Sequence, residues 1–258
     1  MPDPMELPIV TCAWIAEDFQ PDGDVFKPVW DFADALWLAS SRRPRTGPLP
    51  SEELGLAAAA SDLADEASCN PSARRWTAAG LLYSHTALYV GFFCLDRDIW
   101  AGYTQHDDPL YDEEVCELFV APGGDVRRYQ EIEVNPLGVT FDADITSPDR
   151  VRSTMVVNRE WECEGLTAGV RVDGHVASRR AGGGDSGSAW WSVELRVPFA
   201  SLPGGTTPTP GDEWRANLFR IDRARAVQYL SWSATLATPA NFHVPDRFGR
   251  VRFGQARA

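Results

Sequence analysis

Residues 191–199 read WSVELRVPF, and this stretch decides how the rest of the chain is interpreted. Apolar side chains recur in it at every second position: Trp191, Val193, Leu195 and Val197. Polar side chains occupy the positions between them: Ser192, Glu194 and Arg196. A period of two places the two kinds of side chain on opposite faces of an extended strand. The stretch therefore predicts an antiparallel strand with one buried face and one solvated face.

Similar short runs occur through much of the chain. They are LYVGFFCL (88–95), VCELFV (115–120), YQEIEVN (129–135), GVTFDA (138–143) and WRANLFRI (214–221). Turn-forming residues separate several of them, as in Pro-Gly-Gly at 122–124. Many short strands with such turns predict an all-β protein, an antiparallel two-sheet β-sandwich in which residues 1–258 form a single domain. The Ala-rich region within residues 40–75 breaks the pattern and predicts a loop or short-helix insertion.

The charge of the chain narrows the class of ligand. Its 258 residues include 24 Lys and Arg against 37 Asp and Glu, which gives a formal net charge of −13. Such a field repels phosphate backbones and anionic lipids, so we expect neither nucleic acid nor a membrane as partner. No stretch approaches the ~18 consecutive apolar residues of a membrane span. A neutral, hydroxyl-rich ligand and a divalent cation both remain compatible with this charge, and nothing in the sequence indicates an oligomeric state.

The cysteines and the first residues bear on the cellular compartment. The five cysteines are widely spaced and form no CxxC pair, which predicts neither a disulfide framework nor a zinc site. Cys94 and Cys116 lie in apolar runs and are expected to be buried thiols. The first residues, MPDPMELPIV, lack the basic start and apolar segment of a secretory signal and predict the cytoplasm. Removal of a leader from a longer precursor would instead indicate a secreted or periplasmic protein.

Eight landmarks in a fixed order resemble the family 9 carbohydrate-binding modules, a group of DOMON-like β-sandwiches. They are Asp22-Gly23 with Trp30, then the segments 88–96, 111–122, 129–138, 191–202, 211–222, 229–234 and 245–253. The resemblance implies non-catalytic binding of a monosaccharide, an oligosaccharide or a polysaccharide chain end. It also implies a link to carbohydrate catabolism, together with a glycoside hydrolase acting on O-glycosyl bonds. A shared fold does not by itself transfer a ligand, so the site residues need their own argument.

In sugar-binding members of this family two Trp residues lie on either side of a sugar ring, and the resemblance places Tyr111 and Phe242 at those positions. Both positions stay aromatic but carry smaller rings, which predicts a weaker clamp. The resemblance also implies Glu117 as an acceptor for sugar hydroxyls. A basic residue of the relatives is replaced by Glu133, so the polarity of the site changes. His243, next to Phe242, could supply a further polar group, because sugars present apolar faces ringed by hydroxyls.

The carboxylates allow other interpretations. Val115 and Phe119 flank Glu117 on its strand face, so its carboxylate needs a partner, either a ligand hydroxyl or an internal arginine such as Arg220. Glu131 and Glu133 share a face at period two, a spacing that indicates a solvated strand face.

Three aspartate pairs give oxygen-rich turns of the kind that binds calcium: Asp96 with Asp98, Asp107 with Asp108, and Asp142 with Asp144. Some members of the family that the chain resembles also hold structural calcium. The sequence is therefore compatible with one structural calcium ion, but it does not indicate which residues bind that ion. Trp30, Trp191, Trp214 and Trp232 are expected in the core, whereas Trp100 is either a loop anchor or an additional stacking surface.

Two other functions remain open. The chain could be a DOMON-like interaction or structural protein that has lost sugar binding, with Tyr111 and Phe242 packed against its own loops. Intrinsic O-glycosyl hydrolysis would need two carboxylates, for which Glu117 and Glu133 on neighbouring strands are candidates. A haem-binding role, known in the wider DOMON group, is not supported, because the chain has three Met and no evident Met/His axial pair.

Overall fold

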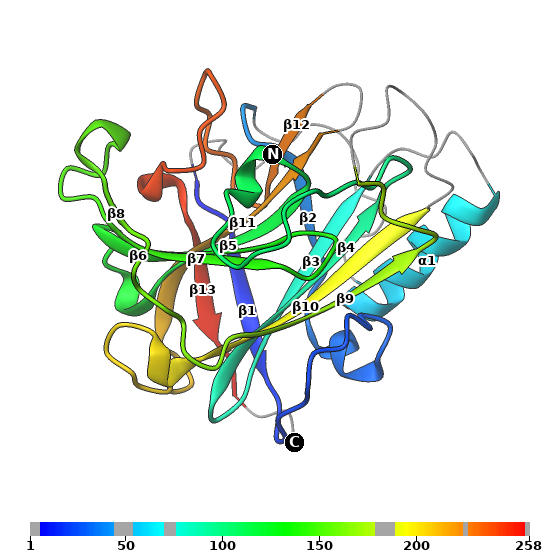
Figure 1. Ribbon diagram of the computed structural model, residues 1–258. Coiled ribbons are helices and arrows are strands. Elements are labelled where there is room, and N and C mark those ends of the chain that lie inside the picture. Colours follow the sequence, from blue (N-terminus) through cyan, green and yellow to red (C-terminus); the bar gives the residue numbers. More distant parts are fainter. Residues whose placement is uncertain (1–5, 44–53, 70–75, 179–188, 224–226, 256–258) are drawn as a thin grey trace.

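The computed structural model describes residues 6–43, 54–69, 76–178, 189–223 and 227–255, and β-strands make up most of them (Figure 1). The strands are β1 (Ile9–Trp14), β2 (Leu36–Ser40), β3 (Thr77–Tyr83), β4 (Ala87–Leu95), β5 (Val115–Ala121), β6 (Arg128–Val134), β7 (Thr140–Thr146), β8 (Val156–Asn158), β9 (Thr167–Asp173), β10 (Trp190–Pro198), β11 (Glu213–Asp222), β12 (Gln228–Ser231) and β13 (Gly249–Phe253). One α-helix, α1 (Leu56–Cys69), lies among the described residues. Short 3-10 helices complete them: η1 (Pro28–Phe32), η2 (Leu110–Asp112), η3 (Pro122–Gly124), η4 (Arg152–Thr154), η5 (Phe199–Ser201) and η6 (Pro245–Arg247). The all-β prediction is confirmed.

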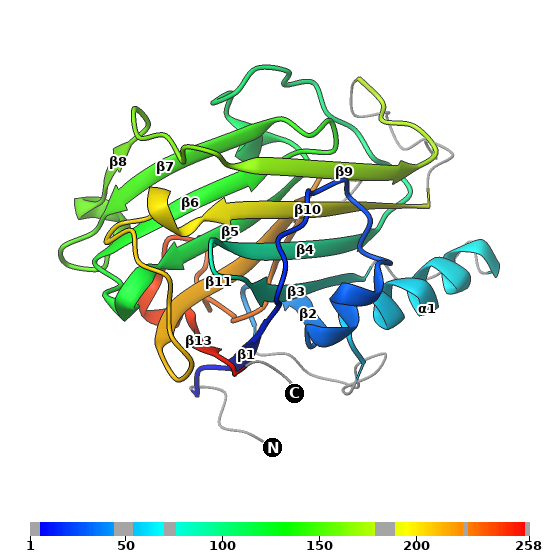
Figure 2. The same cartoon turned by 90° about the horizontal axis from the view of Figure 1, so that it is seen from below.

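The strands lie in two layers (Figure 2), and hydrogen-bonded strand pairs join these layers. The path β8-β7-β6-β5-β11-β12 forms layer A, and β2-β3-β4-β10-β9 forms layer B. Strand β12 pairs with β2, and β1 pairs with both β13 and β3, so the layers continue into one 13-stranded sheet that folds over on itself. The prediction of two separate sheets is therefore only partly correct. The antiparallel neighbours dominate as expected, but β1 pairs in parallel on both of its sides.

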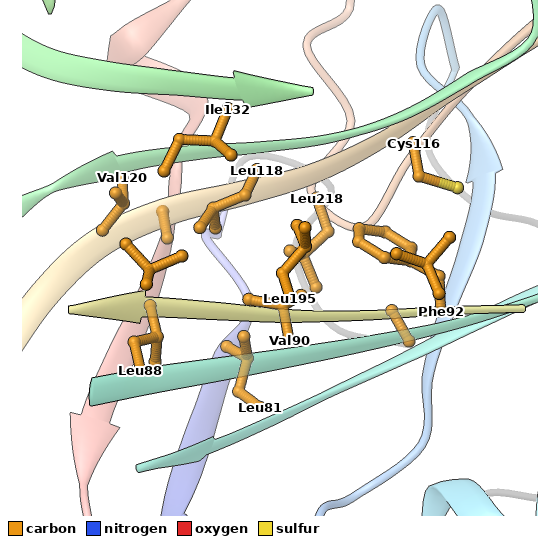
Figure 3. Packing of buried hydrophobic residues seen from close by; sticks show 14 of the residues in the cluster. Leu81, Leu88, Val90, Phe92, Cys116, Leu118, Val120, Ile132, Leu195 and Leu218 are labelled. Atoms are coloured by element: carbon orange, nitrogen blue, oxygen red, sulfur yellow. The ribbon is translucent and has the colours of Figure 1, made fainter. Parts of the chain in front are cut away.

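The main core fills the space between the layers (Figure 3). Leu118 of β5 and Leu218 of β11 point into it from layer A, and Val90 of β4 and Leu195 of β10 point into it from layer B. Each is at most 2% exposed. Full burial of such a side chain contributes roughly 1.5–3 kcal/mol, so this cluster is the main source of stability. Cys94 and Cys116 also lie in it as free thiols, as predicted, with their Sγ atoms 3.5 Å apart.

The outer face of layer B is also buried, which corrects the prediction for residues 191–199. Glu194, expected on a solvated face, is 0% exposed. Its carboxylate accepts hydrogen bonds from Trp30 Nε1 at 2.7 Å and from Lys27 Nζ at 2.8 Å. Because the segment that contains η1 covers this face, β10 is buried on both sides. A period of two identifies the two faces of a strand but not whether a later or earlier segment covers the polar one.

Helix α1 packs beside η1 on the same outer face, against β3 and β4 (Figure 2). A Cβ added at Gly91 would lie 2.6 Å from Leu56 Cδ2 and 3.0 Å from Trp30 Cη2, so a larger residue here would force these side chains to shift. The insertion expected within residues 40–75 therefore contains a helix; its residues 44–53 and 70–75 lie outside the described part. Three of the four tryptophans expected in the core are buried, namely Trp30, Trp191 and Trp214, and Trp232 is partly buried against it.

The outer face of layer A positions the candidate site. Large side chains of β5, β6, β7 and β11 gather there, among them Phe119, Tyr129, Phe141 and Phe219. Residues of η2, of the η4–β8 segment and of the segment before β13 cover them, and Figure 1 shows these segments around one end of the molecule. None of the helices in the described ranges has the length and apolar character needed to cross a membrane.

Candidate functional site

A pocket of about 240 Å³ lies on the outer face of layer A. Four of the five residues predicted for the site line it: Tyr111, Glu117, Phe242 and His243. They come from η2, β5 and the segment before β13, which are far apart in the sequence. The fifth, Glu133, is 0% exposed and is not among the lining residues, although it lies directly opposite Glu117 in the β5–β6 register.

The two predicted aromatic residues differ in how firmly they are packed. Phe242 is 7% exposed and stacks on Phe219 of β11, with ring centroids 4.1 Å apart. Tyr229 contacts it edge-on. Tyr111 is only half-buried, and its ring meets that of Phe141 edge-on. Tyr111 is therefore more accessible to a ligand than Phe242, which is also part of the protein's own packing, but the guanidinium of Arg159 lies over the Tyr111 ring at 5.8 Å from its centroid.

Three carboxylates meet beneath the pocket. Glu117, Glu131 and Glu133 are 1%, 5% and 0% exposed, and each contributes an oxygen that lies within 4.8 Å of the others. Burial, together with repulsion from neighbouring carboxylates, raises the pKa of Glu117 and Glu133 well above its usual value. Burial also raises the pKa of Glu131 to about 7. The prediction of a solvated face at Glu131 and Glu133 is wrong, because loops from elsewhere in the chain cover it.

Arg220 is not the partner of Glu117. In the β11–β5 register Phe219 lies opposite Glu117, so Arg220 projects from the other face of the sheet. There its Nη2 atom lies 2.5 Å from Asp96 Oδ2 and 3.4 Å from Glu114 Oε2. The strand alternation that places Glu117 toward the pocket thus separates it from this arginine.

His243 is held in a neutral form. Its Nδ1 lies 3.0 Å from the hydroxyl of Tyr129, and its ring lies against Phe119 at 5.1 Å between centroids. Burial, followed by the charge of Arg152, lowers the pKa of His243 to about 4. Its Nε2 lies 4.0 Å from Glu131 Oε1, so an uncharged imidazole borders the carboxylates.

Several lining residues were not predicted from the sequence. Arg152, Arg159 and Asn241 add donors to the pocket, and Arg159 Nη2 donates to the Tyr111 hydroxyl at 2.5 Å. Asn241 precedes Phe242 in the chain, which is a signal that could have been used. The two arginines follow β7 in a segment without strand pattern, and nothing in the sequence indicates where it folds back. Trp100 is partly buried and is not among the lining residues.

The described residues contain three clusters of side chains of the type that binds metals. They are His106 with Asp142 and Glu162, Asp96 with Glu114 and Asp222, and Glu117 with Glu131 and Glu133. None of the three predicted aspartate pairs places both of its carboxylates in one cluster. Asp142 lies near His106, whereas Asp144 pairs with Arg128 at 3.0 Å. A structural calcium ion, with no place assigned to it, stays a prediction.

Known structures share this fold at low sequence identity. A protein of Bacteroides uniformis, provisionally assigned as carbohydrate-binding, superposes with a TM-score of 0.66 at 14% identity, covering 96% of this chain and all of that one. A family 9 carbohydrate-binding module of Caldicellulosiruptor kristjanssonii in complex with cellotriose gives a TM-score of 0.56 at 12% identity, covering 97% of this chain and 95% of that one. A family 9 carbohydrate-binding module of Caldicellulosiruptor kristjanssonii in complex with glucose gives a TM-score of 0.55 at 11% identity, with 97% of each chain covered.

A curated relative and a family model also match the sequence of this chain. A curated relative from Arthroderma benhamiae, named "Extracellular protein", is 25% identical over 154 residues, which are 57% of this chain and 64% of that protein. The chain thus spans less than two thirds of the length of this relative. Its name does not support the cytoplasmic prediction for the present chain. A family model described as carbohydrate-binding family 9 matches residues 75–253. Since this match spans well over half of the chain and the fold agrees with it, the protein belongs to carbohydrate-binding family 9.

Proposed function

We propose that the protein binds a saccharide without catalysis in the pocket on the outer face of layer A. The observation that carries this proposal is that Tyr111, Phe242 and the buried carboxylate of Glu117 line one pocket. Aromatic rings suit the apolar faces of a sugar, and a carboxylate accepts hydrogen bonds from its hydroxyls. Family membership supports the same class of ligand.

The size and polarity of the pocket favour a small ligand. Its volume of about 240 Å³ lies below the ~300–1,000 Å³ of clefts that hold drug-sized molecules, which favours a monosaccharide or a chain end over an internal polymer segment. Arg152, Arg159 and Asn241 supply donors opposite the acidic floor. Both donors and acceptors are thus available to the hydroxyls of one sugar ring. The link to carbohydrate catabolism stays a prediction.

Hydrolysis is less well supported. A glycosidase presents two carboxylates to the bond that it cleaves. Glu133 is 0% exposed and does not line the pocket, so it has no access to a bound glycoside. Glu131 lines the pocket, but it contributes an oxygen within 4.8 Å of one on Glu117, a separation below both the ~5–5.5 Å of retaining and the ~6.5–9.5 Å of inverting glycosidases. We therefore favour binding alone.

Titration calorimetry tests the proposal. The purified protein is titrated with glucose, cellotriose and a panel of other mono- and oligosaccharides, and the reducing ends are assayed afterwards for hydrolysis. Saturable heat that is lost in Tyr111→Ala supports the proposal, with Phe32→Ala as a control because Phe32 is 46% exposed and does not line the pocket. Absence of heat with every sugar would favour an interaction protein in which Tyr111 and Phe242 only pack against its loops.

A further inference from the structure

The carboxyl groups of Glu117 and Glu133 beneath the pocket differ from three other buried carboxylates described above, which are paired with Lys or Arg. Glu194 binds Lys27, and Asp96 and Glu114 surround Arg220. Among the described residues no Lys or Arg forms an ion pair with Glu117 or Glu133. Burial of a carboxylate without a partner costs several kcal/mol, so such an arrangement needs a compensating charge or protons.

The hydrogen-bond donors are incomplete as well. Within the described part of the chain no group donates a hydrogen bond to Glu117 Oε1, and Glu133 has only the backbone amide of Tyr111 and the carboxyl group of Glu131 near its oxygens. Glu117 is 1% exposed and lines the pocket, so its carboxyl group lies next to the pocket. Buried polar atoms without partners are uncommon in folded proteins, and the carboxyl groups of Glu117 and Glu133 lie side by side in this cluster.

We propose that Glu117, Glu131 and Glu133 bind one oxygen-preferring divalent cation at the floor of the pocket. A cation between three oxygens that lie within 4.8 Å of one another sits about 2.8 Å or less from each, and small side-chain movements bring it to the ~2.3–2.6 Å of calcium–oxygen bonds. Three carboxylates form a hard donor set that suits Ca²⁺ or Mn²⁺. The charge of the ion replaces the protons that the raised pKa values would otherwise require.

The surroundings of the cluster fit this assignment. His243 is uncharged, so it does not compete with the ion for the carboxylates, and its Nε2 lies 4.0 Å from Glu131 Oε1. Arg152 and Arg159 line the pocket above but form no ion pair with Glu117 or Glu133 in the described structure. The open side of the cluster faces the pocket, where water or a ligand oxygen can complete the coordination of the ion.

The cation also refines the proposed function. If a saccharide occupies the pocket, its hydroxyl oxygens can complete the coordination of the ion, so the ion would contribute directly to sugar binding. This second step rests on the proposed function, whereas the binding of the ion itself does not. The two other clusters do not carry the same inference: Arg220 already neutralises Asp96 and Glu114, and His106 already lies 3.1 Å from Glu162.

The experiment measures ion binding without any sugar. The full chain is stripped with a chelator, returned to chelator-free buffer at pH 8, and titrated with Ca²⁺ and Mn²⁺ by calorimetry and, for Mn²⁺, by electron paramagnetic resonance. We expect one ion per chain, with affinity lowered more than about tenfold in Glu117→Gln and Glu131→Gln. Glu162→Gln, in the exposed cluster around His106, should retain the affinity. Circular dichroism confirms that each variant is folded.

The outcomes separate the two proposals. No saturable ion binding, or binding lost in Glu162→Gln and kept in Glu131→Gln, overturns the cation site. Saccharide titrations are then run with chelator and with Ca²⁺. Sugar binding without any ion leaves the proposed function standing and removes the cation site. Ion binding without sugar binding supports the cation site and contradicts the proposed function. Binding of glucosamine together with no ion binding would show that the carboxylates recognise an ammonium group instead.

Discussion

Glu117 of β5 lies directly opposite Glu133 of β6, and both carboxylates are buried on the outer face of layer A. Two like charges on directly opposite positions of neighbouring strands destabilise a sheet. Glu131, two residues before Glu133 on the same face, adds a third carboxylate. The fold therefore holds three buried carboxyl groups whose ionised forms would repel one another, an arrangement that stability alone would not select and that is found at functional sites.

The first prediction concerns the stability of the ion-free protein. At pH 8 the carboxylate of Glu131 is ionised, because its pKa is about 7, and its charge is buried beside two other carboxylates. Replacement by Gln removes this charge, so Glu131→Gln should raise the free energy of unfolding by about 1–3 kcal/mol. Urea unfolding in the presence of a chelator measures the difference. Glu162→Gln should stay within about 0.5 kcal/mol of the unsubstituted protein. Destabilisation by Glu131→Gln at pH 8 would show that the buried charge of Glu131 does not oppose folding.

The second prediction concerns pH. The pKa of Glu131 is raised from 4.5 in the unfolded chain to about 7, so the folded state binds more protons between these values and stability falls as pH rises. His243 acts oppositely, since its pKa is lowered from 6.5 in the unfolded chain to about 4, but the rise in stability that it causes is already half-titrated at pH 6.5 and levels off about one pH unit higher. Unfolding free energies should therefore decrease from pH 6.5 to 8 in the ion-free protein.

The control for this pH profile is the difference between two proteins. His106, whose pKa is raised, also loses stabilising charge as pH rises, but it is present in both the unsubstituted protein and Glu131→Gln. Subtraction of the two profiles leaves the contribution of Glu131 and its coupling to the other carboxylates. Identical slopes in the two proteins above pH 6.5 would show that Glu131 does not titrate there.

The strand-rich fold could be predicted from the sequence because alternating or apolar residues mark the strands locally. The alternation in residues 191–197 identifies the inward face correctly, and Leu195 lies in the main core. It could not show that the segment around Trp30 covers the opposite face and supplies partners to Glu194. Coverage of a strand face depends on contacts between residues more than a hundred positions apart, which no local pattern contains.

Only part of the site was predicted from the sequence, because the rest also depends on contacts between distant segments of the chain. Tyr111, Glu117 and Phe242 were found from the order of landmarks and His243 from its place next to Phe242, and all four line one pocket. Glu131 was assigned to solvent because its spacing alone is that of an exposed face. Its burial depends on the segments before β8 and before β13, whose positions follow from packing and not from periodicity.

A third prediction uses the arginine on the other face of the sheet. Arg220 is 0% exposed and pairs with Asp96 and Glu114, so Arg220→Met leaves two buried carboxylates without their cation. Loss of one partner of a buried ion pair costs about 3–5 kcal/mol, and we expect a loss of that size in urea unfolding. Arg128→Met provides the control, because Arg128 pairs with Asp144 near the surface and its loss should cost less than about 1 kcal/mol. Equal costs for the two variants would contradict the distinction.

A fourth prediction separates packing from ligand binding at Phe242. This ring is 7% exposed and stacks on Phe219, so Phe242→Ala should lower the free energy of unfolding by about 3–5 kcal/mol. Phe242→Leu fills much of the same space and should cost less than about 1.5 kcal/mol. Thermal unfolding measures both. If Phe242→Leu remains folded yet loses saccharide binding, the aromatic ring itself contacts the sugar; if it binds normally, Phe242 serves packing alone.

The fifth prediction addresses Tyr111, which combines exposure with a defined position. Its hydroxyl accepts a hydrogen bond from Arg159 and its ring lies edge-on to Phe141, so the ring is oriented but remains half-buried. Loss of an aromatic contact beyond its area costs about 0.5–1.5 kcal/mol, which corresponds to a 2- to 13-fold loss of affinity, and loss of the buried area adds to this. Tyr111→Ala should therefore weaken saccharide binding by at least about tenfold in calorimetry. Tyr111→Phe should retain most of the affinity, because it keeps the ring and removes only the hydroxyl. If Tyr111→Phe is as weak as Tyr111→Ala, the hydroxyl and its bond to Arg159 matter more than stacking, and the sugar is held by polar contacts at this position.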